Sequence, residues 1–178
     1  SFDTSEKYQL VSFNGEIYFP VDDDSGDGVE LWKSNGTADG TVMVKDIRSG
    51  SASSSPMYVD ETLHKSAVEL NGFLYFAAND GSKGRELWRT NGTEDGTALF
   101  TDVRNGGTGS FPREFLVAMD KIFFKATSGS FGKELFVTDG TSTTLFYDFY
   151  GGGNTHNNHG LGQSNSHLTL SDTALYLS

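Results

Sequence analysis

Cysteine is absent from this chain of 178 residues, and proline is scarce, with three copies. The absence of cysteine excludes disulfide bonds and thiolate metal sites, and it leaves the cellular compartment open. The shortage of proline means that the turns must be built mainly from Gly, Asn and Asp. No apolar run of roughly 18 residues occurs, so we expect no membrane span, and no signal-peptide pattern is visible.

Basic residues are also few. Lys and Arg number 13 against 24 Asp and Glu, which gives a formal net charge of -11 at pH 7. These basic residues are scattered along the chain, whereas phosphate binding depends on clustered Lys and Arg. We therefore expect no nucleic-acid partner, and the charge favours cations or a neutral or basic partner.

Aromatic residues are abundant, with 14 Phe and 7 Tyr in a chain that is only 35% hydrophobic. An aromatic apolar fraction suits strands better than helices, and 22 Gly residues can supply the turns between strands. A chain of this length can bury roughly 70% of the surface that its unfolded form exposes. We predict an all-β protein with a single domain over residues 1–178.

The chain repeats itself. Three units cover residues 9–66, 67–115 and 116–167, and a partial fourth covers 168–178. Each begins with a predicted hairpin, "LVSFNGEIYF", "AVELNGFLYF", "LVAMDKIFF" or "LTLSDTALYL". Asn14-Gly15 and Asn71-Gly72 are strong hairpin signals because a type I′ turn needs positive φ at both central residues. A third strand such as "RELWRT" and a fourth such as "ALFTDV" follow in each complete unit, which predicts four antiparallel strands per unit.

The apolar pattern of these strands decides how the units pack. Segments such as "FLYF" and "VMVKDI" carry apolar residues on both alternating faces, so both faces of each sheet must be covered. Stacking of neighbouring units does this, and units of about fifty residues are typical of a β-propeller. We predict a propeller-like domain of about four blades, the last of which is incomplete and could be completed by residues 1–8. A linear array and a fragment of a longer repeat protein are the alternatives.

Two long stretches carry a family resemblance. "GVELWKSNGTADGTVMVKDIRSGSASSSP" and "GRELWRTNGTEDGTALFTDVRNGGTGSFP" resemble the ELWxxDGT repeat family, whose units recur in large exported proteins, mostly from marine and gliding bacteria. The third unit has Phe136 in place of Trp but keeps Asp139, Gly140 and Thr141. The resemblance covers nearly the whole chain. It implies a secreted or surface-attached, β-propeller-like module, with no catalytic residues to carry over.

Acidic and aromatic residues recur in register. The acids are Glu30, Glu86, Glu134, Asp46, Asp102 and Asp148. Catalysis needs one asymmetric pair with separated pKa values, so the repetition favours salt bridges or backbone capping. Trp32 and Trp88 lie on the same strand face as the glutamates and are candidate ligand-binding residues that could stack on a sugar ring. The substitution by Phe136 favours the alternative, which is packing between neighbouring sheets.

The acidic loop, residues 22–28 with the sequence "DDDSGDG", contains the candidate metal ligands Asp22, Asp23, Asp24 and Asp27. It imitates the first half of a calcium loop, in which closely spaced oxygens surround a hard cation. The twelfth loop position would be Ser34 instead of Glu, and the equivalent loops of the other units carry fewer acids. Calcium is the one cofactor expected, and a solvated acidic turn is the alternative.

The remaining candidates lie in a loop and in the repeat turns. His156 and His159, in the Gly- and Asn-rich run 151–167, are candidate ligand-binding residues. Binding of zinc or copper by His156, His159 and His167 is an alternative, although a metal site needs ligands held in place, and such composition is typical of a loop or linker. Asn35 and Asn91 stand in sequons, which would be glycosylated in an exported eukaryotic protein. Turn chemistry explains these Asn residues equally well.

These observations predict a non-catalytic extracellular binding module. Its expected partner is carbohydrate or another matrix polymer, bound by loops between the blades, and repeated weak sites would gain avidity on a repetitive ligand. A structural or adhesive protomer that self-associates through the incomplete fourth unit is the first alternative. An enzyme with an asymmetric site near the third unit is the second, although the chain has no nucleophile elbow, phosphate loop, HExxH or CxxC.

Overall fold

The computed structural model describes residues 8–58, 65–129, 132–147, 168–171 and 174–177. These residues form three four-stranded antiparallel sheets and a final two-stranded hairpin, all in sequence order. The first sheet contains β1 (Val11–Phe13), β2 (Glu16–Val21), β3 (Glu30–Ser34) and β4 (Thr41–Lys45). The second contains β5 (Ala67–Leu70), β6 (Phe73–Asn79), β7 (Arg85–Thr90) and β8 (Ala98–Thr101). The third contains β9 (Arg113–Ala118), β10 (Lys121–Ser128), β11 (Gly132–Thr138) and β12 (Thr143–Tyr147), and the hairpin contains β13 (Leu168–Ser171) and β14 (Ala174–Leu177).

Left-handed turns join the first two strands of each sheet. Asn14 and Gly15 have φ of 52° and 78°, and Asn71 and Gly72 have φ of 53° and 76°, as the predicted type I′ turns require. The third sheet makes the same turn without glycine, because Met119 and Asp120 have φ of 55° and 54°. A left-handed residue other than Gly or Asn is uncommon, so the third hairpin keeps the geometry of the repeat at a local cost.

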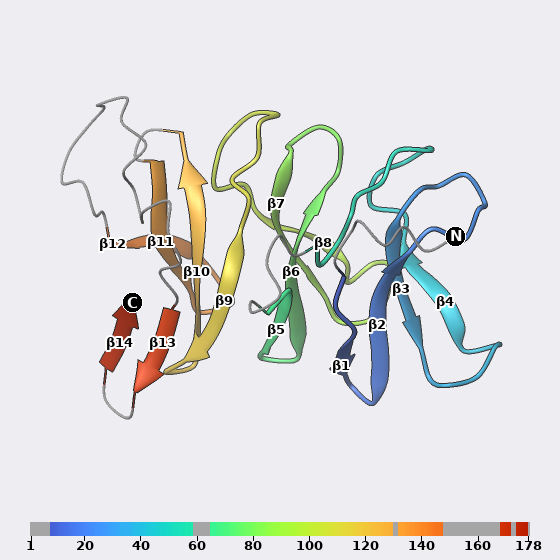
Figure 1. Ribbon diagram of the computed structural model, residues 1–178, viewed down its shortest axis with the longest axis horizontal. Helices are drawn as coiled ribbons and strands as arrows, with labels where there is room; N and C mark the ends of the chain where they lie inside the picture. The colour runs from blue at the N-terminus through green and yellow to red at the C-terminus, as the bar shows by residue number, and fades with distance from the viewer. Residues whose placement is uncertain (1–7, 59–64, 130–131, 148–167, 172–173, 178) are drawn as a thin grey trace.

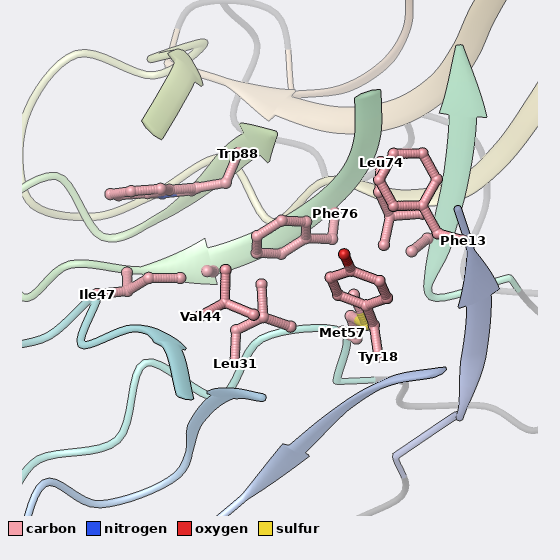
Figure 2. Close-up of a cluster of buried hydrophobic side chains, with 11 residues drawn as sticks. Phe13, Tyr18, Leu31, Val44, Ile47, Met57, Leu74, Phe76 and Trp88 are labelled. Atoms are coloured by element: carbon pink, nitrogen blue, oxygen red, sulfur yellow. The ribbon is translucent and has the colours of Figure 1, made fainter. Parts of the chain in front are cut away.

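Both faces of the second sheet are buried, as the apolar pattern predicts. Leu74 and Phe76 pack with Tyr18 and Leu31 of the first sheet in one cluster, which Figure 2 shows. Tyr75, Ala77 and Leu87 point the other way and belong to the cluster shared with the third sheet. Because side chains on both faces of β6 are buried, apolar residues occupy both alternating sets of positions along this strand.

The sheets stand one after another along the longest axis of the molecule, with the first sheet at one end and the β13–β14 hairpin at the other (Figure 1). The prediction of repeated four-stranded antiparallel sheets with an incomplete last unit is confirmed. Among the described residues, no closed ring of sheets is detected.

Candidate functional site

The glutamates of the ELW segments are buried hydrogen-bond acceptors. Glu30 is fully buried, and its Oε2 accepts hydrogen bonds from the Ile47 amide at 2.9 Å and the Ser54 hydroxyl at 2.6 Å. Its Oε1 accepts the Ser54 amide at 3.0 Å. Burial raises the pKa of Glu30 above its usual value, and these hydrogen bonds oppose that rise.

The same arrangement recurs one unit later. Glu86 is fully buried and accepts hydrogen bonds from the Val103 amide at 3.0 Å and the Ser110 hydroxyl at 2.5 Å. Ser54 and Ser110 then bind the next sheet through their carbonyls, which accept the amides of Asn79 and Thr127. Glu30 and Glu86 therefore hold the connections 46–58 and 102–112 in place by hydrogen bonds. The backbone-capping interpretation is confirmed for these two residues.

The two tryptophans have different surroundings. Trp88 is 6% exposed and packs in the cluster between the first and second sheets, beyond Phe76 and on the side of Ile47 (Figure 2). Trp32, its counterpart in the first sheet, is half-buried. The position of Trp88 favours the packing role over stacking on a sugar.

The repeat turns are organised by their own side chains. Asn35 Oδ1 accepts the Thr37 amide at 3.0 Å, and Asn91 Oδ1 accepts the Thr93 amide at 3.0 Å. Asp139 Oδ1 accepts the equivalent Thr141 amide at 2.8 Å. Asn and Asp serve equally as acceptors here, so turn chemistry accounts for both Asn residues of the sequons.

The acidic loop is exposed and satisfies part of its own hydrogen bonding. Asp22 accepts the Asp24 amide at 2.9 Å, and Asp23 accepts the Ser25 amide at 3.0 Å. Hydrogen bonds from Ser25 lower the pKa of Asp23. Within the described residues, no group of three or more His, Cys, Asp or Glu is placed to hold a metal ion. Calcium binding by Asp22, Asp23, Asp24 and Asp27 stays a prediction, and His156 and His159 lie outside the described residues.

Sequence reasoning did not find a cavity of about 530 Å³. The connections 46–58 and 102–112, which lead from each sheet to the next, contribute much of its wall, together with the ends of β6, β7, β9, β10 and β11. Four cationic side chains line it, and they are Arg48, Arg85, Arg113 and Lys133. None of its lining residues, all of them in the described part of the chain, is acidic. This cluster of cations differs locally from the formal net charge of -11, from which the sequence predicts cations or a neutral or basic partner.

Two exposed aromatic residues stand at this cavity. Tyr58 is 40% exposed and Phe111 is 51% exposed. Phe111 also has a φ of 55°, which is unfavourable for a bulky residue. The equivalent residue of the first unit is Ser55, which has a φ of 45°, so the loop geometry does not require an aromatic side chain. Neither burial nor backbone conformation explains why Phe stands at position 111.

Hydrogen bonds hold the wall of the cavity in place. Arg85 Nη1 donates to the Ser55 carbonyl at 2.7 Å, and its guanidinium lies 5.6 Å from the centre of the Tyr58 ring. The Arg85 carbonyl accepts the amides of Ser110 and Phe111, both at 3.0 Å. Arg85 therefore ties one connection to the other and fixes both aromatic residues at the rim.

The sequence did contain one signal for this cavity. Arg48 and Arg104 recur two residues after the aspartate of their units, and each packs over a glycine of the next unit, Gly81 and Gly129. The recurring arginine therefore indicates where one unit contacts the next, and Arg48 lines the cavity at such a contact. The aromatic residues could not be found in the same way because neither recurs.

The third unit departs from the repeat at a buried ion pair. Lys125 Nζ lies 2.5 Å from Glu114 Oε2, and both side chains are largely buried. The second unit has Ala77 and Ser66 at these two positions. Neither partner of the ion pair lines the cavity, so the pair belongs to the packing of the third sheet.

Comparison with protein-family models, curated proteins and solved structures finds no significant match. Among the described residues, no helix is long and apolar enough to cross a membrane.

Proposed function

We propose that the protein is a non-catalytic binding module that takes an acidic carbohydrate, a sugar polymer with carboxylate or sulfate groups, in the cavity between its sheets. The observation that carries the proposal is the exposed side chain of Phe111 at the rim of a cavity lined by Arg and Lys. The cavity volume, about 530 Å³, is within the usual range for small-ligand sites, roughly 300–1,000 Å³.

Each part of the lining suits one part of such a ligand. Tyr58 and Phe111 offer ring faces against which the apolar face of a sugar can pack. Arg48 can bind a carboxylate or sulfate with two parallel hydrogen bonds, and Lys133 adds a point charge. Asn79 and Thr127 supply an amide and a hydroxyl for sugar hydroxyl groups.

The repeat architecture supports a polymeric ligand. The connections that frame the cavity recur between sheets, so a chain with more units would repeat this frame at regular intervals, whereas Tyr58 and Phe111 do not recur. Sites spaced along a rigid protein gain avidity when the ligand is also repetitive. The resemblance to the ELWxxDGT repeat proteins supports placing this binding outside the cell, in a secreted or surface-attached protein.

The test is binding of a uronic-acid oligosaccharide and of its neutral counterpart, measured by isothermal titration calorimetry. We expect the acidic oligosaccharide to bind more tightly, and we expect Phe111→Ala to weaken its binding about fivefold or more, because loss of one stacked ring costs about 1–3 kcal/mol. Met119→Ala is the matched control, because Met119 is also exposed, has the same φ of 55° and lies outside the cavity. Equal binding by Phe111→Ala and Met119→Ala would contradict the proposal.

A further inference from the structure

Cations recur at two positions of the repeat, on the side of the molecule where the cavity lies. The first position is the arginine of each connection, which is Arg48 and then Arg104. The second position directly precedes the buried glutamate of the next unit, and it is Arg85 in the second unit and Lys133 in the third. We call Arg48 and Arg85 the first cation pair, and Arg104 and Lys133 the second cation pair.

The structure places each pair where one sheet meets the next. In the first pair, Arg48 packs over Gly81, with its Nε 3.0 Å from where a Cβ on that glycine would stand. Arg104 of the second pair packs over Gly129 in the same way, at 3.9 Å. Each glycine lies four residues before the second cation of its pair. The connections that carry the two arginines emerge at the same edge of the stacked sheets, uppermost in Figure 1, so both pairs lie along this edge.

The fold does not require a cation at the second position. The first unit has Val29 where the later units have Arg85 and Lys133, and the same strand follows it. Lys133 is exposed, and its ammonium group forms no hydrogen bond or ion pair in the part of the chain that the structure describes. Arg104 is half-buried, and its guanidinium has no acidic partner within the same residues. The second pair can therefore bind an anion without first giving up a partner of its own.

The acids near the second pair do not compete for it. Asp80, at the first pair, accepts backbone amides of its own loop, and its counterpart at the second pair is Ser128. Asp102 lies two residues before Arg104, but its Oδ2 is already 3.2 Å from Lys83 Nζ. An anion at Arg104 therefore meets less repulsion than the formal net charge of the chain suggests.

The spacing of the two pairs matches a polymer. Neighbouring sheets pack face to face through hydrophobic clusters, and sheets packed in this way lie about 10 Å apart. Equivalent cations of successive units therefore recur at about this interval, which is close to the length of a disaccharide. A polymer with an acidic group on every second sugar can place one such group at each pair.

The second pair begins where the cavity ends, because Lys133 lines the cavity and Arg104 stands outside it. We propose, on the basis of the function proposed above, that the acidic polymer continues from the cavity past Lys133 to Arg104, and that its acidic groups recur at every second sugar. The ligand is thus longer than the cavity, and Arg104 selects for its length and for the spacing of its charges.

Isothermal titration calorimetry with ligands of two lengths tests this extension. The ligands are an acidic disaccharide and a hexasaccharide with a uronic acid at every second sugar. We expect Arg104→Gln to weaken binding of the hexasaccharide about fivefold or more, because a hydrogen-bonded charge is lost, and to leave disaccharide binding unchanged. Unchanged disaccharide binding also shows that the variant folds. Arg104→Lys keeps the charge and should weaken hexasaccharide binding less than Arg104→Gln does.

Lys121→Gln is the matched control. It removes one positive charge from an exposed residue at the first position of β10, whereas the cavity lies at Thr127, near the other end of this strand. A hexasaccharide with a single uronic acid at one end is the control ligand, and Arg104→Gln should weaken its binding by less than about twofold.

Failure of this extension and failure of the proposed function give different results. If Arg104→Gln weakens hexasaccharide binding no more than Lys121→Gln does, or weakens binding of both lengths equally, the extension is wrong, while Phe111→Ala still weakens binding of both ligands. If Phe111→Ala changes the binding of neither ligand, the proposed function fails and the extension fails with it.

Discussion

Replacement of Gly92 by alanine measures how strongly one repeat unit docks on the next. Gly92 and Gly36 have φ of 92° and 91°, so Ala bears the same backbone cost at either position, about 1–2 kcal/mol. Only at Gly92 does the added Cβ collide with the Tyr18 hydroxyl of the preceding unit. Overpacking of this kind costs a further ~1–3 kcal/mol, so we expect Gly92→Ala to lower the free energy of unfolding by about 2–5 kcal/mol.

The assay is urea denaturation of dilute protein, followed by tryptophan fluorescence, since Trp88 lies in the same interface. Gly36→Ala should lower the free energy of unfolding only by the backbone cost of about 1–2 kcal/mol. Tyr18→Phe removes the hydroxyl, so in that background Gly92→Ala should cost no more than Gly36→Ala does. Equal costs for the two single glycine variants, or no rescue by Tyr18→Phe, would refute the reasoning.

Two further predictions concern the stability of the scaffold, and a third concerns calcium binding by the acidic loop. Glu30→Gln should lower the free energy of unfolding by about 1–3 kcal/mol in urea denaturation, because its amide group must face N–H or O–H donors, whereas exposed Glu94→Gln should change it by less than about 0.5 kcal/mol. Because burial raises the pKa of Glu30, the folded state binds the carboxyl proton more tightly than the unfolded state does, and the protein with Glu30 loses stability as pH rises from about 4.5. The loss of unfolding free energy caused by Glu30→Gln should therefore become smaller as pH rises. A loss that becomes larger would contradict this reasoning. Lys125→Ala should lower the free energy of unfolding by about 3–5 kcal/mol, because it leaves Glu114 buried without its ion pair. The double variant Lys125→Ala with Glu114→Ser should lose less than the sum of the two single variants. Additive losses in this double-mutant cycle would contradict the prediction. Calcium should bind the acidic loop only weakly, with a dissociation constant on the order of 0.1–1 mM. We expect Asp23→Asn to raise this dissociation constant. Calorimetry that shows no loss of calcium affinity in this variant would exclude the site.

The sequence predicts most of the fold because its signals are local and recur. Asn14-Gly15 and Asn71-Gly72 predict hairpins through the φ angles that they permit, and the structure confirms both. The repetition of Glu30 and Glu86 predicts a scaffold role, which their hydrogen bonds to Ile47 and Val103 confirm. The turn at Met119 shows that the repeat holds its geometry even where the glycine signal is missing.

The cavity and the arrangement of the sheets were harder to predict. The cavity brings together side chains from connections that lie far apart in the sequence, and its aromatic residues have no counterpart in the other units, as Phe111 and Ser55 show. Two apolar faces on each sheet indicate that sheets stack. They do not determine whether the stack closes, because that depends on small rotations at each interface and not on the residues of any one strand.

The most direct test of the carbohydrate proposal is to locate the bound ligand by nuclear magnetic resonance during titration with a uronic-acid oligosaccharide. The account predicts that the amide signals of Ser53, Thr108 and Thr127, which line the cavity on three different segments, shift together. Signals of the acidic loop should stay unchanged. Shifts confined to the acidic loop, or no shifts at any cavity residue at saturating oligosaccharide, would contradict the assignment of this cavity as the binding site.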